Sequence, residues 1–287
     1  MKKSVNHTFR LIAILLTATY FTACNNDEDA VQADTSAEDL EIVSEASFTN
    51  TLADEDLEMV ELVTEASISG GKTSNHHLPE CAVVTRDAEN QQVIIDFGEE
   101  CIGPFGRTRS GKIIISYGGE FNDQMANRVI SFDNYVVNNR QISGTIELRN
   151  FNRSEEGFLT ATRALVGYTV TYPDGNSVTV NGSTLREWIE GEGDGDPLTN
   201  VIRITGGYEG TSTRGVRFTH TITEPVIARF ACRAQGGFLR TAGIIEMIRK
   251  NENFSKERIR TILYGDDICD NTITVIINGR EFTITEE

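Results

Sequence analysis

Apolar and polar residues alternate along most of the chain that follows residue 79. Short stretches in which every second residue is apolar, rich in Val, Ile, Thr and aromatic residues, recur up to the C-terminus. Alternation with a period of two is typical of β-strands that bury one face. The pattern predicts strands at residues 93–97, 112–117, 129–132, 141–148, 160–166, 168–172, 177–180, 201–205, 216–222, 226–230, 272–277 and 280–285.

Turn residues between these stretches predict hairpins. Pro-Asp-Gly-Asn at residues 173–176 combines a proline that presets one turn dihedral with a glycine that accepts a positive φ. Asn278-Gly279 closes the last hairpin, because both residues tolerate the positive φ of a two-residue turn. Connections this short require neighbouring strands to be antiparallel.

Residues 243–263 admit two interpretations. Ile244, Met247 and Ile248 fit the spacing of a helix, whereas the alternation along 244–249 and the Asn-Glu-Asn at 251–253 fit a hairpin. We expect the hairpin.

The segment before residue 70 has a different pattern. From Asn25 to Ala66 it holds fourteen acidic residues and neither Lys nor Arg, and no Gly or Pro occurs before Gly70. Apolar residues recur every three to four positions at 38–48 and 54–67, which predicts two short helices. Because like charges at this density oppose compaction, we expect an acidic tether that docks only loosely on the β domain.

The N-terminus has the features of a secretory signal peptide. Lys2, Lys3 and Arg10 precede an apolar run over residues 11–21, which is shorter than the about 20 residues that cross a bilayer. Residues 21–24, Phe-Thr-Ala-Cys, resemble a bacterial lipobox, in which Cys24 receives lipid (diacylglyceryl and palmitate chains) and becomes the first residue of the mature chain. The alternative is an ordinary cleaved signal with an incidental cysteine, since Phe replaces the usual Leu.

The residues after Cys24 bear on location. Asn-Asn-Asp-Glu-Asp at 25–29 resembles the surface-export signal of Bacteroidota lipoproteins, which would place the protein on the outer face of the outer membrane. The alternative is a solvated tether on the periplasmic face. In either case the membrane is contacted through the lipid, because several buried acyl chains give a persistent anchor.

The charge and the apolar content of the chain indicate which classes of binding partner and which domain size to expect. The formal net charge of −17 repels phosphate backbones and anionic headgroups, so nucleic acid is not an expected partner. An apolar content of 39% suffices for one large packed domain. We therefore divide the chain into a signal peptide (1–23), a lipidated acidic tether with two short helices (24–70) and an antiparallel β domain (71–287).

Four cysteines remain besides Cys24, and an even number in an exported chain predicts two disulfides. Residues 95–101 (Ile-Asp-Phe-Gly-Glu-Glu-Cys) resemble residues 262–269 (Ile-Leu-Tyr-Gly-Asp-Asp-Ile-Cys), and another cysteine lies ahead of each. This local similarity favours the pairs Cys81–Cys101 and Cys232–Cys269, each adding about 3 kcal/mol by restricting the unfolded chain. A four-cysteine metal site is the alternative, but the chain has no Cys-x-x-Cys pair.

Several segments together resemble uncharacterised Bacteroidota surface lipoproteins. These segments are 94–98 with Cys101, 106–113, 132–138 with 142–145, 187–191, 204–206, 264–266 with 269–271, and 275–279. The resemblance spans about residues 79–285 and implies a glycine-punctuated antiparallel meander at the cell surface, with no catalytic residues. Asn139 departs from the usual Gly, which leaves the type of that turn open.

Catalytic motifs are absent from the sequence. It contains no Gly-x-Ser-x-Gly, His-Glu-x-x-His, P-loop or Rossmann fingerprint. His76 and His77 lie in a polar linker, and His220 lies in a predicted strand, where a half-buried polar residue is the simplest interpretation. The sequence therefore predicts no enzyme, no cofactor and no metal.

Three other features could contact a ligand, although each has a plainer explanation. The acidic stretch 190–196 could surround Ca²⁺, but a β-turn is favoured because the stretch lacks a calcium-loop pattern. Arg107, Arg109 and Lys112, with Arg214 and Arg217, could bind an acidic glycan or a carboxylate ligand, but charged residues on the solvated face of a sheet are favoured. Trp188, the single tryptophan, is assigned to packing.

The predicted fold is a mainly β meander that forms a curved open sheet or half-barrel, with a two-sheet sandwich as the alternative. The predicted function is a non-enzymatic structural or ligand-binding lipoprotein whose small-molecule, glycan or protein ligand the sequence does not identify. The alternative is a carrier that encloses an apolar ligand or lipid in a half-barrel. The two differ in whether the concave face is open and apolar or filled by the protein itself.

Overall fold

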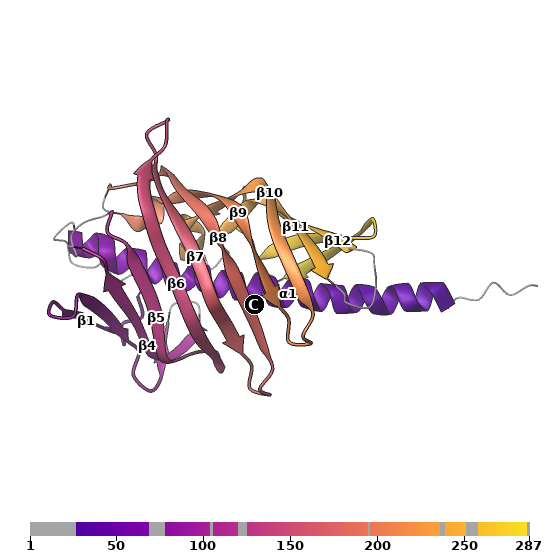
Figure 1. Ribbon diagram of the computed structural model, residues 1–287, viewed down its shortest axis with the longest axis horizontal. Coiled ribbons are helices and arrows are strands. Elements are labelled where there is room, and N and C mark those ends of the chain that lie inside the picture. The colour runs from indigo at the N-terminus through magenta and orange to yellow at the C-terminus, as the bar shows by residue number, and fades with distance from the viewer. Residues whose placement is uncertain are drawn as a thin grey trace, which may run out of the picture.

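The computed structural model describes residues 27–68, 78–103, 106–119, 125–194, 196–235, 239–250 and 258–285, and in the helix it describes side chains from residue 37 to residue 64. A helix, α1 (Asp27–Ile68), crosses the concave side of an antiparallel sheet (Figure 1). The strands are β1 (Val83–Asp87), β2 (Gln92–Asp96), β3 (Cys101–Ile102), β4 (Thr108–Tyr117), β5 (Arg128–Val137), β6 (Arg140–Arg153), β7 (Leu159–Thr171), β8 (Ser177–Glu190), β9 (Val201–Thr211), β10 (Arg217–Arg229), β11 (Arg240–Lys250), β12 (Arg258–Asp266), β13 (Thr272–Ile277) and β14 (Arg280–Thr285).

The sheet is a 14-stranded meander in chain order, with β1 and β14 at its two ends and the short β3 paired to β4. Its strand pairs are antiparallel, from β1 with β2 to β13 with β14. The predicted mainly β, antiparallel open sheet is confirmed, and the sandwich alternative is not formed. Residues 243–263 belong to the hairpin of β11 and β12, as expected.

Two hairpin turns have the backbone that their residues predict. Asn278 and Gly279 have φ values of 52° and 75°, which a two-residue turn between β13 and β14 requires. Asn138 and Asn139 have φ values of 46° and 62°, so the β5–β6 turn is of the same kind. Asn139 does not alter the turn, because asparagine tolerates a positive φ better than other non-glycine residues.

Two expected strand breaks are irregularities within longer strands. The predicted strands 160–166 and 168–172 form the single strand β7, whose register with β8 shifts between Leu165 and Tyr168. The predicted strands 216–222 and 226–230 likewise form β10, whose register with β9 shifts between Thr221 and Val226. Such bulges increase the local twist and bend a strand, which helps a long sheet to curve.

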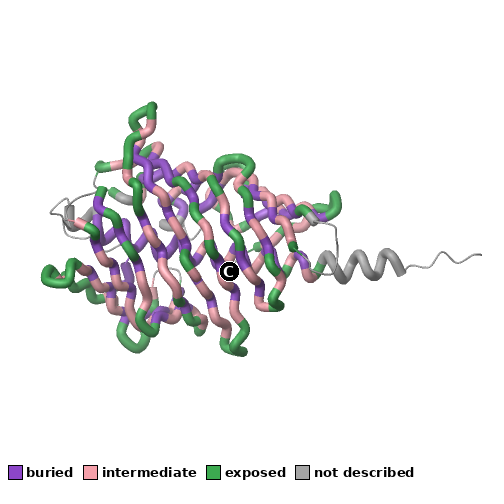
Figure 2. Tube along the Cα trace, in the orientation of Figure 1, coloured by how far each residue is buried: buried purple, intermediate pink, exposed green. Residues whose placement is uncertain are grey.

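The acidic segment differs from its prediction. Residues 38–48 and 54–67 belong to one continuous helix, because Thr49 and Asn50 donate hydrogen bonds to the carbonyls of Glu45 and Ala46 and do not interrupt it. Every residue from 52 to 64 is buried (Figure 2). The expectation of a loosely docked tether is therefore wrong: the helix lies inside the sheet's curve.

Helix and sheet share one hydrophobic core. On the helix it includes Val43, Leu57 and Val60, and on the sheet it includes inward residues of strands from β2 to β13, among them Ile113 and Val275. These residues have relative exposures of 0%. The helix is thus packed as a central element of the fold.

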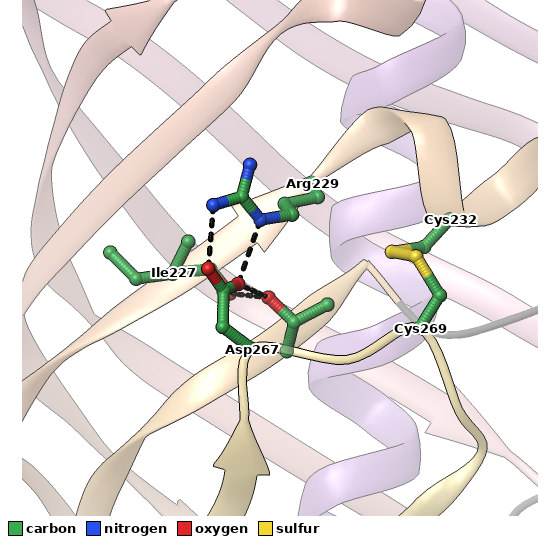
Figure 3. Close-up of a disulfide and its surroundings, with 6 residues drawn as sticks. Ile227, Arg229, Cys232, Asp267 and Cys269 are labelled. Atoms are coloured by element: carbon green, nitrogen blue, oxygen red, sulfur yellow. Dashed lines mark hydrogen bonds and ion pairs between the residues drawn. A yellow bond between two sulfur atoms is a disulfide. The ribbon is translucent and has the colours of Figure 1, made fainter.

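Both predicted disulfides are present. Cys81 joins Cys101 and Cys232 joins Cys269, with Cα–Cα distances of 5.6 and 5.1 Å. Beside the second disulfide, Asp267 accepts hydrogen bonds from Arg229 (2.7 Å from Nε) and from Thr241 (2.6 Å), as Figure 3 shows. Asp267 of the acidic pair at 266–267 thus has a structural role at this corner.

Candidate functional site

The inner face of the sheet carries a set of arginines that point toward α1. Alternation along each strand places them on the same face as the apolar core residues, and most of them are buried. We call this set the arginine groove: Arg107, Arg109, Arg128, Arg140, Arg163, Arg186, Arg240, Arg249 and Arg260. A buried guanidinium needs a compensating charge, because desolvation of an unpaired charge is costly.

Three consecutive carboxylates of α1 supply that charge at the centre of the groove. Asp54, Glu55 and Asp56 have relative exposures of 5%, 1% and 0%. Successive helical residues point about 100° apart, because a turn takes 3.6 residues. The three side chains therefore reach different strands of a sheet that surrounds the helix.

Asp54 and Glu55 each bind two arginines. Asp54 pairs with Arg163 of β7 and with Arg240 of β11, the latter at 2.8 Å from Nε to Oδ2. Glu55 accepts hydrogen bonds from Arg107 (Nη2, 2.8 Å) and from Arg109 (Nη2, 3.0 Å), which lie before and within β4. Asp54 thus joins two strands that are far apart in the sequence, whereas Glu55 binds two arginines at the start of β4.

Asp56 binds tyrosines rather than arginines. It accepts hydrogen bonds from the hydroxyls of Tyr135 (2.8 Å) and Tyr168 (2.9 Å), and Arg109 donates to the oxygen of Tyr135 (3.1 Å). Burial raises the pKa of Asp56 to about 6, although the nearby charge of Arg109 and the two hydroxyls partly oppose the shift. Burial, together with the Asp56 charge, raises the pKa values of both tyrosines well above the ordinary value, so they remain hydrogen-bond donors.

The charge balance differs at Asp54. Burial alone would raise its pKa, but the guanidinium groups of Arg240 and Arg163 outweigh burial and hold the pKa below its ordinary value. Asp54 is therefore ionised across the physiological range. Asp56, two residues further along the helix, instead has its pKa raised to about 6.

Further contacts continue toward both ends of the helix. Asp39 pairs with Arg260 of β12 and with Arg249 of β11 (3.0 Å), and Glu38 also pairs with Arg249 (2.8 Å). Glu61 pairs with Arg186 of β8 at 3.3 Å. The acidic residues of α1 therefore contact arginines over most of the helix length that the structure describes.

Aromatic rings supply part of the contact with the arginines. Phe48 of α1 lies against Arg140, whose guanidinium carbon is 4.7 Å from the ring centroid, and against Arg107 at 6.0 Å. At the other end, the hydroxyls of Thr64 and Tyr117 lie 3.0 Å apart. Stacking of guanidinium on an aromatic face is favourable and partly replaces lost hydration.

Some polar groups in this layer have no hydrogen-bond partner within the described part of the chain. They are Ser47 Oγ and Asn50 Oδ1 on α1, Thr184 Oγ1 on β8, and both ring nitrogens of His220 on β10. Burial lowers the pKa of His220 to about 3, and its ring lies 4.8 Å from that of Tyr208. The expected half-buried histidine is thus a fully buried, neutral one.

The sequence singled out part of the groove but judged it wrongly. Arg107 and Arg109 were expected on a solvated face and are instead buried against Glu55. Lys112 is only half-buried and pairs with Asp96 at 3.0 Å. Arg214 lies at the rim and pairs with Glu41 at 2.6 Å. The other groove arginines were missed, although alternation gives a signal for them. Arg140, Arg163 and Arg260 each lie two positions before a buried apolar residue of the same strand and therefore face the core.

The remaining candidates have structural surroundings. Trp188 is buried and packs beside Arg186. In the acidic turn, Glu192 binds Arg153 (2.6 Å) and Asp194 accepts a hydrogen bond from the Thr199 hydroxyl (2.6 Å). Cys24, His76 and His77 lie outside the described residues.

An open hollow of about 590 Å³ lies over strands β8 to β10. Its floor includes Gly206 and Gly207, and Asn181, Glu209 and Thr219 also line it. Because the hollow is open to solvent, it does not suit an enclosed acyl chain.

Within the described part of the chain, no cluster of three or more His, Cys, Asp or Glu could hold a metal ion, and no helix is long and apolar enough to cross a membrane. Comparisons with protein-family models, with curated proteins and with solved structures found no match to this chain.

Proposed function

We propose that this protein is a non-enzymatic lipoprotein that is anchored in the outer membrane by acylation of Cys24 and faces the cell exterior. In this proposal the anchor holds the β-sheet in a fixed orientation. The single observation that carries the proposal is the enclosure of residues 37–64 of α1 by the sheet, with ion pairs from Glu38 to Glu61. Helix α1 begins at Asp27, three residues after Cys24. A lipid at Cys24 is thus joined to the body of the protein by an element of the fold itself.

The side-chain chemistry of the interior supports a binding or structural role over catalysis. The buried carboxylates bind arginines or tyrosines, and buried His220 lies between aromatic rings with its pKa held low. Acid–base catalysis needs a titratable group within reach of a reacting proton. The buried carboxylates of α1 are instead enclosed between helix and sheet.

The carrier alternative has less support. In a half-barrel carrier the ligand lies against the concave face, and here α1 occupies that face with Leu57 and Val60 at 0% exposure. Native mass spectrometry of the purified mature chain tests this point. We expect the mass of the polypeptide without bound lipid, whereas a co-purifying lipid on the Cys24→Ser chain would favour the carrier.

The anchor is tested by Cys24→Ser in a Bacteroidota host. We expect loss of labelling by a palmitate analogue and release from the membrane fraction, with an unchanged circular dichroism spectrum. Protease added to intact cells reports the face: digestion of the wild-type protein supports surface display. Retention of the variant in membranes, or protection of the wild type in intact cells, would overturn the corresponding part of the proposal.

A further inference from the structure

The arginine groove contacts α1 through separate ion pairs, in the way that a binding site contacts a charged ligand. Its ionic contacts fall at positions 38–39, 54–55 and 61 of the helix. At a rise of about 1.5 Å per residue, positions 39 and 61 are roughly 33 Å apart along the helix axis. The groove therefore recognises charge at several separated points along one helix.

The ionic composition of this interface is unusual for a permanent core. Replacement of a buried ion pair by apolar residues of similar size is often neutral or stabilising, so burial of many pairs is not explained by stability alone. Fixed charge pairs do provide specificity, because a helix without the matching carboxylates leaves Arg163 or Arg240 uncompensated. The interface thus selects its occupant by charge pattern.

Both surfaces also carry buried polar groups that their contact leaves without hydrogen-bond partners among the described residues. Ser47 and Asn50 lie on the same side of α1 as Asp54, and Thr184 lies directly opposite Arg163 in the β7–β8 register. Their oxygens, like the His220 nitrogens, lack partners within the described structure when helix and sheet are together. Separation of the two surfaces would therefore hydrate groups that now have no hydrogen-bond partner, which lowers the cost of exchange.

We propose that the inner face of the sheet is a recognition site for acidic amphipathic helices, which α1 of the same chain occupies as a resident ligand and α1 of a second copy can occupy in its place. The ligand is defined by carboxylates that match Arg163 and Arg240, Arg107 and Arg109, and Arg249 and Arg260. This inference concerns the soluble body of the protein and does not depend on lipidation.

A direct test supplies the helix as a peptide. The resident helix competes at a high effective concentration, so it is first weakened by Asp54→Asn in the mature chain that carries Cys24→Ser. A fluorescent peptide with the sequence of residues 37–64 is then added, and anisotropy and thermal unfolding are measured. We expect saturable one-to-one binding and a rise in Tm of the variant toward that of the parent chain.

Matched peptides separate recognition from non-specific attraction. A peptide with Asp54→Asn should bind at least about tenfold more weakly, because it leaves the same arginines unpaired. A peptide with Glu41→Gln should bind like the parent peptide, because Glu41 pairs with Arg214 at the exposed rim. A scrambled peptide of identical composition measures attraction by charge alone.

The outcomes are decisive in either direction. Absence of binding, or equal binding of the parent, Asp54→Asn and scrambled peptides, would overturn the proposal. If the Asp54→Asn chain does not fold, it is refolded from urea with each peptide present. Recovery of cooperative unfolding with the parent peptide alone supports the proposal, and failure with every peptide contradicts it.

Discussion

Asp54 shows how much the fold depends on one carboxylate. It is the shared partner of Arg163 and Arg240, both buried and from strands far apart in the chain. We predict that Asp54→Asn lowers the free energy of unfolding by about 3–5 kcal/mol, because two buried guanidinium groups lose their counter-charge. Urea denaturation followed by circular dichroism measures the change.

The matched control lies on the same helix. Glu41 pairs with Arg214 at 2.6 Å, but their side chains are 43% and 55% exposed. Glu41→Gln should therefore change the free energy of unfolding by less than about 1 kcal/mol, since exposed pairs contribute little. Equal losses in the two variants would show that helix charge, and not burial of the pair, decides stability.

For Asp56 we predict that stability depends on pH with the opposite sign to that of an ordinary salt-bridged carboxylate. Its pKa is about 6 in the folded protein against a model-peptide value of 3.8. A raised pKa stabilises the folded state below the unfolded pKa, and this contribution is lost as the pH rises through 6. The loss amounts to about 2 kcal/mol between pH 4 and pH 7, because part of the contribution is already lost at pH 4.

Asp56→Asn removes this titration while it keeps a side chain that can hydrogen-bond to Tyr135 and Tyr168. Relative to the wild type, the variant should gain about 2 kcal/mol in unfolding free energy between pH 4 and pH 7. Urea titrations at several pH values measure the difference, in which contributions from other groups cancel. A difference that does not vary with pH would mean that Asp56 does not titrate in this range.

Among the structural elements, the strands depend on glycines at bulges. Gly144 in β6 has a φ of +94°, and a Cβ built there would lie 2.2 Å from the carbonyl oxygen of Gly167 in β7. We predict that Gly144→Ala costs about 2 kcal/mol or more, because it adds a backbone clash to an unfavourable φ. Gly157 has nearly the same φ, +91°, but no atom within 4 Å of its Cβ position.

Gly157→Ala should therefore cost only the conformational part, about 1 kcal/mol. Differential scanning calorimetry of both variants gives the comparison. If Gly157→Ala proved as costly as Gly144→Ala, the close approach of β6 and β7 would not be the cause.

Element by element, the sequence predicted strands better than the helix. Period-two alternation marks a half-buried strand directly, so the meander, the closing Asn278-Gly279 turn and the β11–β12 hairpin were predicted correctly. The bulges in β7 and β10 were interpreted as breaks, because Gly167 and the irregular stretch after Thr221 locally interrupt the alternation. The register across the bulge comes from neighbouring strands and is not encoded locally.

The helix was misjudged for a different reason. Its carboxylates, considered alone, repel one another and predict a solvated spacer. The compensating charges lie on residues from Arg107 to Arg260, more than fifty positions away in sequence. Only a fold that places these arginines on one face can bury the helix.

For the whole molecule, helix and sheet should be mutually dependent. We predict that a chain starting at residue 69, without α1, loses cooperative unfolding and binds a hydrophobic dye, because inward residues such as Ile113 and Val275 become exposed beside unpaired arginines. Near-ultraviolet circular dichroism and thermal scans test this prediction. A cooperative transition within a few degrees of the parent chain would contradict it.

By itself, the sequence determined the antiparallel meander and the two disulfide pairs, and it led to the expectation of an acylated, exported chain. Each of these rests on a local pattern: alternation, turn residues, repeated Cys-containing segments or a signal peptide. The tertiary structure alone decided that the acidic segment is the centre of the fold. The physical reason is that the cost of burying a charge depends on its surroundings, and the groove arginines that surround Asp54, Glu55 and Asp56 are assembled only when the sheet curves around the helix.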